Sequence, residues 1–160
     1  MSNVLPDFDH MGYLPPANDL YCPDINEFIT RFVEVDGSSK RKKIFEGYQS
    51  YCTRFRSIII KLWVDGSYIT DKLNPNDIDL TVHYDAIKFN DLRIIQFVEK
   101  GYFANRKYLK AKYECDTFPV PVYPKNHPFY QLTVAQSEKW RKWFTKDRNG
   151  IPKGLVELLL

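Results

Sequence analysis

The sequence predicts a mixed α/β (α+β) fold, in which helices flank a small mixed β-sheet. Three observations lead to this class. The chain has 160 residues and 44% of them are hydrophobic, which suffices to bury one core. Stretches with the apolar spacing of amphipathic helices alternate with short β-branched and aromatic runs. The apolar runs stay well short of the ~20 residues that cross a membrane.

The predicted elements form one domain over residues 1–160. It consists of an irregular arm (1–23), a helical segment (24–56) and a sheet-containing core (57–160). The expected ranges within it are helices at 25–34 and 40–55, strands at 57–65 and 77–84 with a helical turn at 68–72 between them, a helix at 89–100, mostly strand at 108–122 interrupted by its prolines, a helix from 137 to about 147, and a last strand at 155–160.

Local residues set the expected ends of these elements. Asp24 is suited to cap a helix, and Glu27 lies three residues on, at the spacing of a capping box. The β-branched and aromatic run 58–64 is typical of a buried strand. Gly101 is expected to end the preceding helix as its C′ residue, and Ser137 is expected to begin the late one.

The charge and the cysteine content indicate which partners and which cellular compartment to expect. A net charge of +3 and a pI near 8.6 permit a phosphate-bearing partner. Cys22, Cys52 and Cys115 are widely spaced and form no CxxC motif, so we expect reduced thiols in a cytoplasmic protein. The histidines show no zinc-ligand spacing with them. The acidic start of the chain lacks the basic and apolar segments of a secretion signal.

The clearest chemistry lies in the stretch 63–82. Asp77 and Asp79 alternate with apolar residues, so on a strand both point to one face while Ile78 and Leu80 enter a core. Two close carboxylates repel unless a cation lies between them, and a divalent metal is the usual cation. We therefore expect Asp77 and Asp79 to bind a metal. The alternative is a solvated acidic pair on an edge strand.

A phosphate-binding turn is expected just before this pair. Gly66 and Ser67 end the first strand and lead into a helical turn, whose backbone N–H groups and hydroxyl suit a phosphate. The connection returns to the next strand and brings Asp77 and Asp79 beside the same phosphate. Asp65 precedes the glycine and is expected to serve as a turn former, with a role as a fourth site acid as the alternative.

A third carboxylate is expected further along the chain. Asp116 lies among apolar residues, where a lone acid needs a compensating partner. On a strand, Glu114 would share its face and is the alternative ligand, whereas Cys115 would face the core.

Gly66-Ser67, nine further residues and then the pair Asp77 and Asp79 resemble the motif of the polymerase-β-like nucleotidyltransferase superfamily, with Asp116 at the place of its third acid. The resemblance implies a minimal nucleotidyltransferase fold and transfer of a nucleoside monophosphate from a nucleoside triphosphate. It also implies that Asp77, Asp79 and Asp116 hold Mg²⁺ or Mn²⁺, while Gly66 and Ser67 hold the phosphates.

The whole chain is also similar to a family of uncharacterised bacterial and phage proteins with this fold. The matching parts are PDFD and GYLPP within 6–16, VDGSYIT at 64–70, DTFP at 116–119 and KGLV at 153–156. Small toxin–antitoxin nucleotidyltransferases commonly carry an arginine a few residues after the Gly-Ser, and here Lys72 is the candidate for contact with the triphosphate. This resemblance alone suggests a role in toxin–antitoxin or phage–host conflict.

Two basic segments are further candidates for binding. Residues 40–43 open a helix, where positive charge opposes the helix dipole; a solvated run is favoured over a site for RNA or an acidic partner. The segment 102–113 mixes aromatics with cations, which suits single-stranded nucleic acid, and it leads directly to the third acid. Trp140, Trp143 and Phe144 are expected in the core. The cations of the second segment are Arg106, Lys107, Lys110 and Lys112.

We interpret the sequence as a metal-dependent nucleotidyltransferase whose acceptor is a hydroxyl of RNA, such as a tRNA end, or of a protein. Nearly the whole chain is needed for the core, so the acceptor must be a partner macromolecule or dock on the N-terminal helices. One alternative is a nucleotidyltransferase-fold protein that binds without catalysis, as an antitoxin, inhibitor or assembly factor. Another is a glycosyltransferase, since Asp-x-Asp also holds a metal on a sugar nucleotide. The nucleotide, the acceptor and the oligomeric state are left open.

Overall fold

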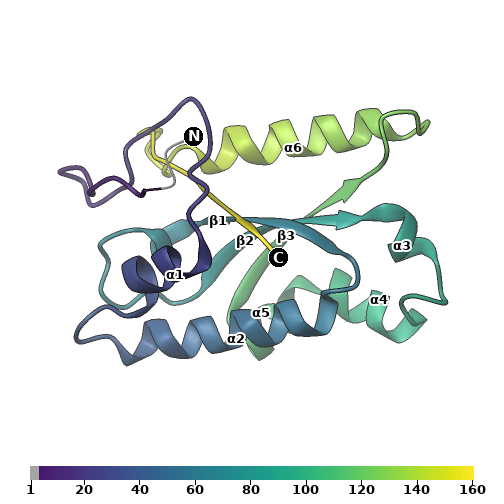
Figure 1. Ribbon diagram of the computed structural model, residues 1–160, viewed down its shortest axis with the longest axis horizontal. Helices are drawn as coiled ribbons and strands as arrows, with labels where there is room; N and C mark the ends of the chain where they lie inside the picture. Colours follow the sequence, from purple (N-terminus) through teal and green to yellow (C-terminus); the bar gives the residue numbers. More distant parts are fainter. Residues whose placement is uncertain (1–3) are drawn as a thin grey trace.

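The computed structural model describes residues 4–160, in which a four-stranded mixed sheet has helices on both sides (Figure 1). The predicted α/β (α+β) class is confirmed. In chain order the elements are α1 (Ile25–Phe28), the π-helical turn η1 (Ile29–Val33), α2 (Ser39–Phe55), β1 (Ile59–Asp65), the 3-10 helix η2 (Gly66–Ile69), β2 (Ile78–Asp85), α3 (Ala86–Asn90), α4 (Phe97–Ala104), α5 (Arg106–Tyr113), β3 (Cys115–Val122), α6 (Tyr130–Phe144) and β4 (Val156–Leu159).

The strands are ordered β3-β2-β1-β4 across the sheet. β1 is antiparallel to both β2 and β4, whereas β2 and β3 run parallel. A parallel pair needs a crossover connection, and α3, α4 and α5 supply it. Figure 1 shows α2, α4 and α5 on one side of the sheet and α6 on the other. The sheet therefore has two covered faces, and each can hold a different set of side chains.

Alternation along β2 sorts its side chains between these faces. Ile78, Leu80 and Val82 are fully buried in the main core, which they share with α2 and α5. The predicted inward orientation of Ile78 and Leu80 is confirmed. Asp79 and His83 take the opposite face, which α6 covers through a smaller apolar cluster. The polar residues of β2 thus lie on the α6 side of the sheet.

His83 is deeply buried on this second face. Its ring centre lies 4.3 Å from that of Trp63, and neither ring nitrogen has a hydrogen-bond partner among the described residues. Burial, aided by the nearby Lys61 charge, lowers the pKa of His83 to about 4 from the ordinary 6.5. The unfolded chain therefore binds this proton more tightly. The stability conferred by the neutral ring is lost as the pH falls from 6.5 towards 4.

The crossover differs from the predicted single helix over 89–100. Asp85 caps α3 by accepting from two backbone amides, so helical structure starts earlier than the apolar spacing suggests. Asp91 adopts an extended backbone and accepts from the amide of Arg93, and such local bonding competes with a helix. The chain becomes helical again in α4. Gly101 lies inside α4, so its predicted role as the end of a helix is wrong.

The predicted strand over 108–122 is wrong in its first half, which forms α5. Asn105 caps α5 through its side chain, and Glu114 ends it with φ 56°, in the left-handed region. β3 then begins at Cys115, which faces the core as predicted. The prolines of β3 do not interrupt it, because an edge strand has backbone N–H groups to spare.

The late helix also starts earlier than predicted. α6 begins at Tyr130, so Ser137 lies inside the helix instead of capping it. Trp140 and Phe144 are four residues apart and share the side that packs on the sheet, as expected for core positions. Trp143 is 71% exposed, and its predicted core position is wrong.

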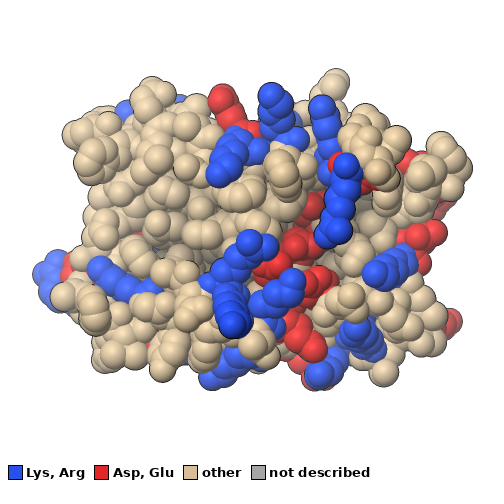
Figure 2. All heavy atoms as spheres, turned by 180° about the vertical axis from the view of Figure 1, so that it is seen from behind, with Lys and Arg blue, Asp and Glu red and all other residues tan. Residues whose placement is uncertain are grey.

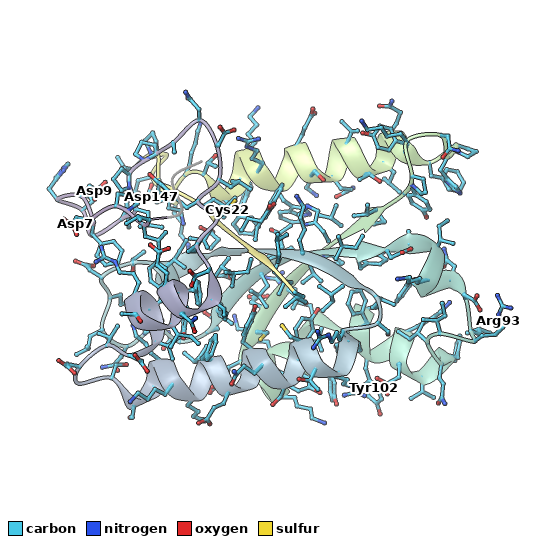
Figure 3. All side chains as sticks on the ribbon, viewed as in Figure 1. Asp7, Asp9, Cys22, Arg93, Tyr102 and Asp147 are labelled. Carbon is cyan, nitrogen blue, oxygen red and sulfur yellow. The ribbon has the colours of Figure 1, made fainter. Side chains whose placement is uncertain are left out.

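Specific contacts hold the N-terminal arm. Asp24 caps α1 as predicted, but Glu27 accepts from an amide of the arm, so the reciprocal bond of a capping box is replaced. Asp9 accepts from the amide of Tyr13, whose hydroxyl donates to Asp147 at 3.2 Å. Figure 3 shows Asp9 and Asp147 at the same end of the molecule. The arm is thereby tied to the segment between α6 and β4.

Arg41 lies in the interior and ties three segments of the chain together. Its guanidinium donates to the carbonyls of Phe32 (2.8 Å), Tyr68 (2.6 Å), Thr70 (2.8 Å) and Lys72 (2.7 Å). The side chain is 1% exposed. The prediction of a solvated basic run is therefore wrong at this position. Arg41 instead fixes the backbone that follows β1, which adjoins the acidic residues described below.

Within residues 4–160, no helix combines the length and the apolar character needed to cross a membrane. Cys22, Cys52 and Cys115 are free, as expected for reduced thiols. Burial raises the pKa of Cys52 to about 12, so its thiol stays protonated and unreactive near neutral pH.

Candidate active site

Three aspartates from neighbouring strands lie side by side at one end of the sheet. Asp65 of β1 is opposite Asp79 of β2, and Asp79 is opposite Asp116 of β3. Residues directly opposite on adjacent strands share a face and lie about 5 Å apart. Asp77 immediately precedes β2 and joins this group through a shared lysine. These four carboxylates are termed the acidic cluster, which brings together the aspartates that the sequence predicts as a site.

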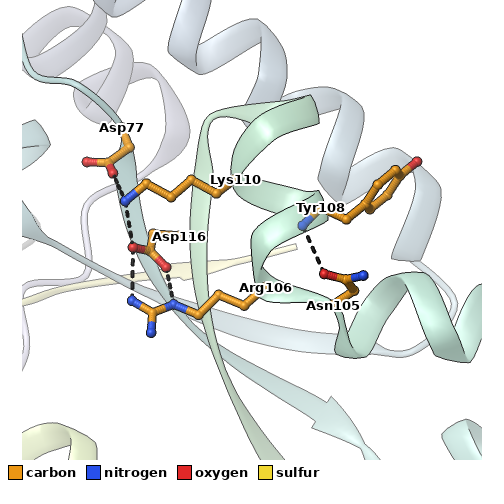
Figure 4. Close-up of polar contacts among 6 residues, drawn as sticks. All are labelled: Asp77, Asn105, Arg106, Tyr108, Lys110 and Asp116. Atoms are coloured by element: carbon orange, nitrogen blue, oxygen red, sulfur yellow. Dashed lines mark hydrogen bonds and ion pairs between the residues drawn. The ribbon is translucent and has the colours of Figure 1, made fainter.

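Two cations of α5 contact the acidic cluster (Figure 4). Lys110 Nζ lies 2.6 Å from Asp77 Oδ2 and 2.9 Å from Asp116 Oδ2. Arg106 binds both oxygens of Asp116, with Nη2 at 3.0 Å from Oδ2. Burial on its own raises the pKa of Asp116, but the hydrogen bonds from Arg106 and Lys110 outweigh it and lower that pKa. Asp116 is therefore a stable carboxylate.

Asp65 has a separate cation on the other side of the cluster. Lys153 Nζ lies 2.6 Å from Asp65 Oδ1, and both side chains are nearly buried. Burial raises the pKa of Asp65, and Lys153 opposes that shift. Asp65 ends β1 directly before the turn at Gly66, so its predicted place at the strand end is confirmed. Its carboxylate faces Asp79, which agrees with the alternative role as a fourth acid of the cluster.

Asp79 is the member of the cluster that lacks a cation. Within residues 4–160 its carboxylate has no hydrogen bond and no ion pair. Burial, followed by the charges of Asp77, Asp65 and Asp116, raises the pKa of Asp79 to about 7. Near neutral pH this carboxylate is thus balanced between its charged and neutral forms. A cation placed beside it would favour the charged form.

The turn after β1 fits closely against Asp79. Gly66 has a φ of +78°, which disfavours any residue with a side chain, and a Cβ built on it would lie 1.9 Å from Asp79 Oδ2. The 3-10 helix η2 begins at this glycine, earlier than the helical turn predicted at 68–72. Only a glycine lets the chain pass this close to the carboxylate.

The two other predicted phosphate contacts differ in placement. Ser67 is half-buried in η2, and its carbonyl accepts from the hydroxyl of Thr70 at 2.9 Å. The Lys72 side chain is exposed and makes no hydrogen bond or ion pair with the described residues. Its carbonyl is held by Arg41. Ser67 therefore adjoins the acidic cluster through Gly66, whereas nothing ties Lys72 to it.

We expect Gly66→Ala to lower the free energy of unfolding by about 2 kcal/mol or more, because left-handed backbone and overlap with Asp79 act together. Gly150→Ala is the matched control. Gly150 has a φ of +81° with nothing within 4 Å of a Cβ, so about 1 kcal/mol of backbone strain is expected there. Urea unfolding of both variants provides the comparison. Equal losses would mean that Asp79 moves aside freely and that the turn is not fitted to it.

Glu114 does not replace Asp116 as a ligand. It precedes β3 in left-handed backbone, and its side chain contacts Lys43 at 3.1 Å. The prediction that it shares a strand face with Asp116 is wrong, because helix α5 extends to Tyr113. Of the two candidates, only Asp116 therefore reaches the acidic cluster.

The sequence places Arg106 and Lys110 in a basic and aromatic segment that leads directly to Asp116, which is where the structure has them, but it does not identify them as ion-pair partners of the acids. Lys153 is not predicted as a cation of the site. The sequence does contain a signal for Arg106 and Lys110: they are four residues apart, follow Asn105, a residue type suited to cap a helix, and have the apolar Leu109 between them. That spacing predicts one charged helix face directed at one partner.

The donor chemistry of the acidic cluster fits a divalent metal. Mg²⁺ and Mn²⁺ bind carboxylate oxygens, which the acidic cluster supplies from adjacent strands. Asp79 is the carboxylate that has no cation beside it. As the side chains stand, no group of three or more His, Cys, Asp or Glu in residues 4–160 has the arrangement of a metal site. Lys110 instead lies between Asp77 and Asp116. A metal on these two aspartates would require the ammonium to leave.

The surface around the cluster carries both charges. Figure 2, which shows the face opposite to that of Figure 1, has acidic side chains in a band that runs from near the centre to the lower edge, with Lys and Arg on both sides. Of the cations that contact the acidic cluster, Arg106 and Lys110 are half-exposed, whereas Lys153 is buried. A ligand that reaches the acids from solvent therefore meets the α5 cations as well.

The fold and site define a mixed α+β protein with aspartates gathered at one end of its sheet. The chain belongs to the family of unknown function DUF6932, whose sequence model matches residues 6–159. No curated protein and no solved structure matches it.

Proposed function

We propose that the protein is a metal-dependent nucleotidyltransferase, which moves a nucleoside monophosphate from a nucleoside triphosphate to a hydroxyl of RNA or protein. One observation carries this proposal: Asp65, Asp79 and Asp116 are opposite one another on three adjacent strands, and Asp79 lacks a cation. A buried, repelling set of carboxylates is costly to a fold, and it is useful where a metal and phosphates bind. The resemblance of Gly66-Ser67 and Asp77-x-Asp79 to the polymerase-β-like superfamily supports it.

Each residue has a role in this proposal. Asp77, Asp79 and Asp116 would hold Mg²⁺ or Mn²⁺, which when bound would offset the negative charge of the triphosphate. Gly66 lets the turn pass directly beside the Asp79 carboxylate, and Ser67 follows it in the turn, so the backbone N–H groups expected to hold the phosphates adjoin the metal-binding acids. The acceptor oxygen bonds to the α-phosphorus, the bond to the β-phosphate oxygen breaks, and pyrophosphate leaves. The acceptor proton passes to a carboxylate of the cluster, for which Asp116 is the candidate.

The proposal also covers the acceptor, the cellular compartment and the biological role. Because β1 to β4 and their helices take up most of the chain, we assign the acceptor hydroxyl to a separate macromolecule, either an RNA such as a tRNA or a protein. The free thiols favour a reducing compartment, and we propose the cytoplasm. The family resemblance extends this to toxin–antitoxin or phage–host conflict.

The test uses transfer of label. The protein is incubated with each α-labelled nucleoside triphosphate, Mg²⁺ or Mn²⁺, total tRNA and a cell lysate. We expect label on a macromolecule, with release of pyrophosphate and loss of transfer in Asp79→Asn. Label that persists in Asp79→Asn would contradict the proposal, and so would the absence of transfer to any acceptor.

A second candidate is a protein of the same fold that binds a partner without catalysis. Its support is the existing compensation of Asp77 and Asp116 by Lys110 and Arg106, which leaves fewer carboxylates open to a metal. Isothermal titration with Mg²⁺ and each triphosphate separates the two candidates. Binding that disappears in the double variant Asp77→Ala/Asp79→Ala favours the enzyme, and the absence of any binding favours the second candidate.

A further inference from the structure

Helix α5 presents two cations to the acidic cluster from one face. Arg106 and Lys110 are four residues apart, while Leu109 and Tyr113 on the other side of the helix are buried. The Arg106 guanidinium also lies 4.3 Å from the centre of the Phe118 ring. Asn105 caps the N-terminus of the helix, and Glu114, whose backbone is left-handed, ends it. Both cations are therefore held at the cluster by a defined element.

The exposed fractions of the side chains indicate which groups of the cluster are fixed and which can move. The Asp116 side chain is 7% exposed and that of Asp77 is 18% exposed, whereas Arg106 and Lys110 are 56% and 50% exposed. The carboxylates are on short side chains, Asp116 within β3 and Asp77 directly before β2, whereas the cations are on long, half-exposed side chains. When another cation arrives at the acids, the arginine and lysine heads are the groups that can move.

Binding of a divalent metal to Asp77 and Asp116 would require such a movement. The four carboxylates of the cluster are met by three side-chain cations, Lys110, Arg106 and Lys153. A divalent metal on Asp77 and Asp116 cannot share their oxygens with the Lys110 ammonium, because like charges at this distance repel strongly. A displaced Lys110 needs a new anionic partner, and a triphosphate beside the same carboxylates supplies one.

We propose that Lys110 and Arg106 are the triphosphate-binding residues of this site, and that without ligand they act as internal counter-ions of Asp77 and Asp116. This inference rests on the proposed function and names the cations of that same site. Lys72, the candidate from sequence, makes no contact with the cluster. The arrangement couples the two ligands: the metal releases the cations to the triphosphate, and the triphosphate draws them away from the metal ligands.

The decisive experiment measures two affinities, which we expect to change in opposite directions. Affinity for Mn²⁺ is measured by electron paramagnetic resonance without nucleotide, and affinity for a non-hydrolysable nucleoside triphosphate is measured with saturating Mn²⁺. In Lys110→Met we expect Mn²⁺ to bind about tenfold more tightly, because its competitor is gone. The triphosphate should bind about tenfold more weakly, because its partner is gone. If Lys110 served only as a counter-ion, the triphosphate affinity would stay unchanged, and if it only held the fold together, both affinities would fall.

Two further variants complete the experiment. Lys107→Met is the matched control, since Lys107 is exposed on the same helix and has no partner among the described residues; it should change neither affinity. Arg106→Met should show the same two signs as Lys110→Met and serves if Lys110→Met does not fold. Circular dichroism and urea unfolding establish that each variant is folded.

The outcomes distinguish this inference from the proposed function. Unchanged or weakened Mn²⁺ binding in folded Lys110→Met and Arg106→Met overturns the inference, and so does an unchanged triphosphate affinity in both variants, even if the wild type transfers nucleotides. The two expected signs without transfer to any acceptor support the inference and count against the enzyme. An absence of Mn²⁺ binding in the wild type and in both variants overturns the two together.

Discussion

Replacement of Arg41 by methionine is expected to lower the free energy of unfolding by about 3–5 kcal/mol, since it leaves four carbonyls in the interior without their donor. Natural domains are stable by only about 5–15 kcal/mol, so this loss is a large part of the total. Methionine fills a similar volume, which keeps the effect on packing small. Urea unfolding, followed by tryptophan fluorescence, measures the change.

The control for Arg41→Met lies next to it in α2. Lys42 is exposed, and Lys42→Met should change stability by no more than about 0.5 kcal/mol. Arg41→Lys keeps the charge but loses the fork that reaches carbonyls on separate segments, so we expect an intermediate loss. If Arg41→Met proved as stable as Lys42→Met, the carbonyls would have found other donors and the role assigned to Arg41 would be wrong.

Asp79→Asn is expected to change activity and stability in opposite directions. It removes a charged oxygen ligand, so nucleotide transfer should fall at least about a thousandfold. It also removes a carboxylate that burial and three neighbouring acids disfavour. Without metal and above pH 7, the free energy of unfolding should rise by on the order of 2–4 kcal/mol. Asp77→Asn is the matched control, since Asp77 already has Lys110 as its partner and should gain less.

The increase in the free energy of unfolding caused by Asp79→Asn should depend on pH. The folded protein keeps the Asp79 proton up to about pH 7, whereas an ordinary aspartate loses it near 3.8. The wild type therefore loses stability as the pH rises from about 4 through 7. Asparagine does not titrate, so the difference between the two proteins is small at pH 4 and largest at pH 8. The opposite trend from His83 occurs in both proteins and cancels.

Urea unfolding at pH 4, 6 and 8 with a metal chelator present measures this difference. A gain of equal size at all three values would mean that removal of the Asp79 charge is not its cause. Stabilisation that disappears when Mg²⁺ is added back would indicate that the metal compensates the wild-type carboxylate.

The first two strands and the acids at the end of the sheet could be predicted from the sequence because short-range patterns determine them, whereas the start of β3 could not. Alternation in β2 placed Asp79 opposite to Ile78 and Leu80, and the apolar surroundings of Asp116 marked it as an acid in need of a partner. The register that puts Asp65, Asp79 and Asp116 in line depends on pairing between strands. No local pattern contains that information.

The cations of the site were harder to predict for a physical reason. The aromatic content of α5 is equally typical of a strand, so Arg106 and Lys110 could not be assigned to one helix face. Arg41 stands among lysines, and only the closure of the chain around it shows that its partners are backbone carbonyls. Lys153 reaches Asp65 from a distant part of the chain. Such pairs are fixed by the fold, not by spacing.

Two kinds of strand connection assemble the acidic cluster, and this has a consequence for folding kinetics. Asp65 and Asp79 meet through neighbouring antiparallel strands, whereas Asp79 and Asp116 meet only when the crossover through α3, α4 and α5 has closed. Non-local parallel pairing requires loop closure first and is slow to form. The repulsion around Asp79 therefore acts on the native state more than on the folding transition state. The stability gained by Asp79→Asn should accordingly be found in slower unfolding, with little change in the folding rate.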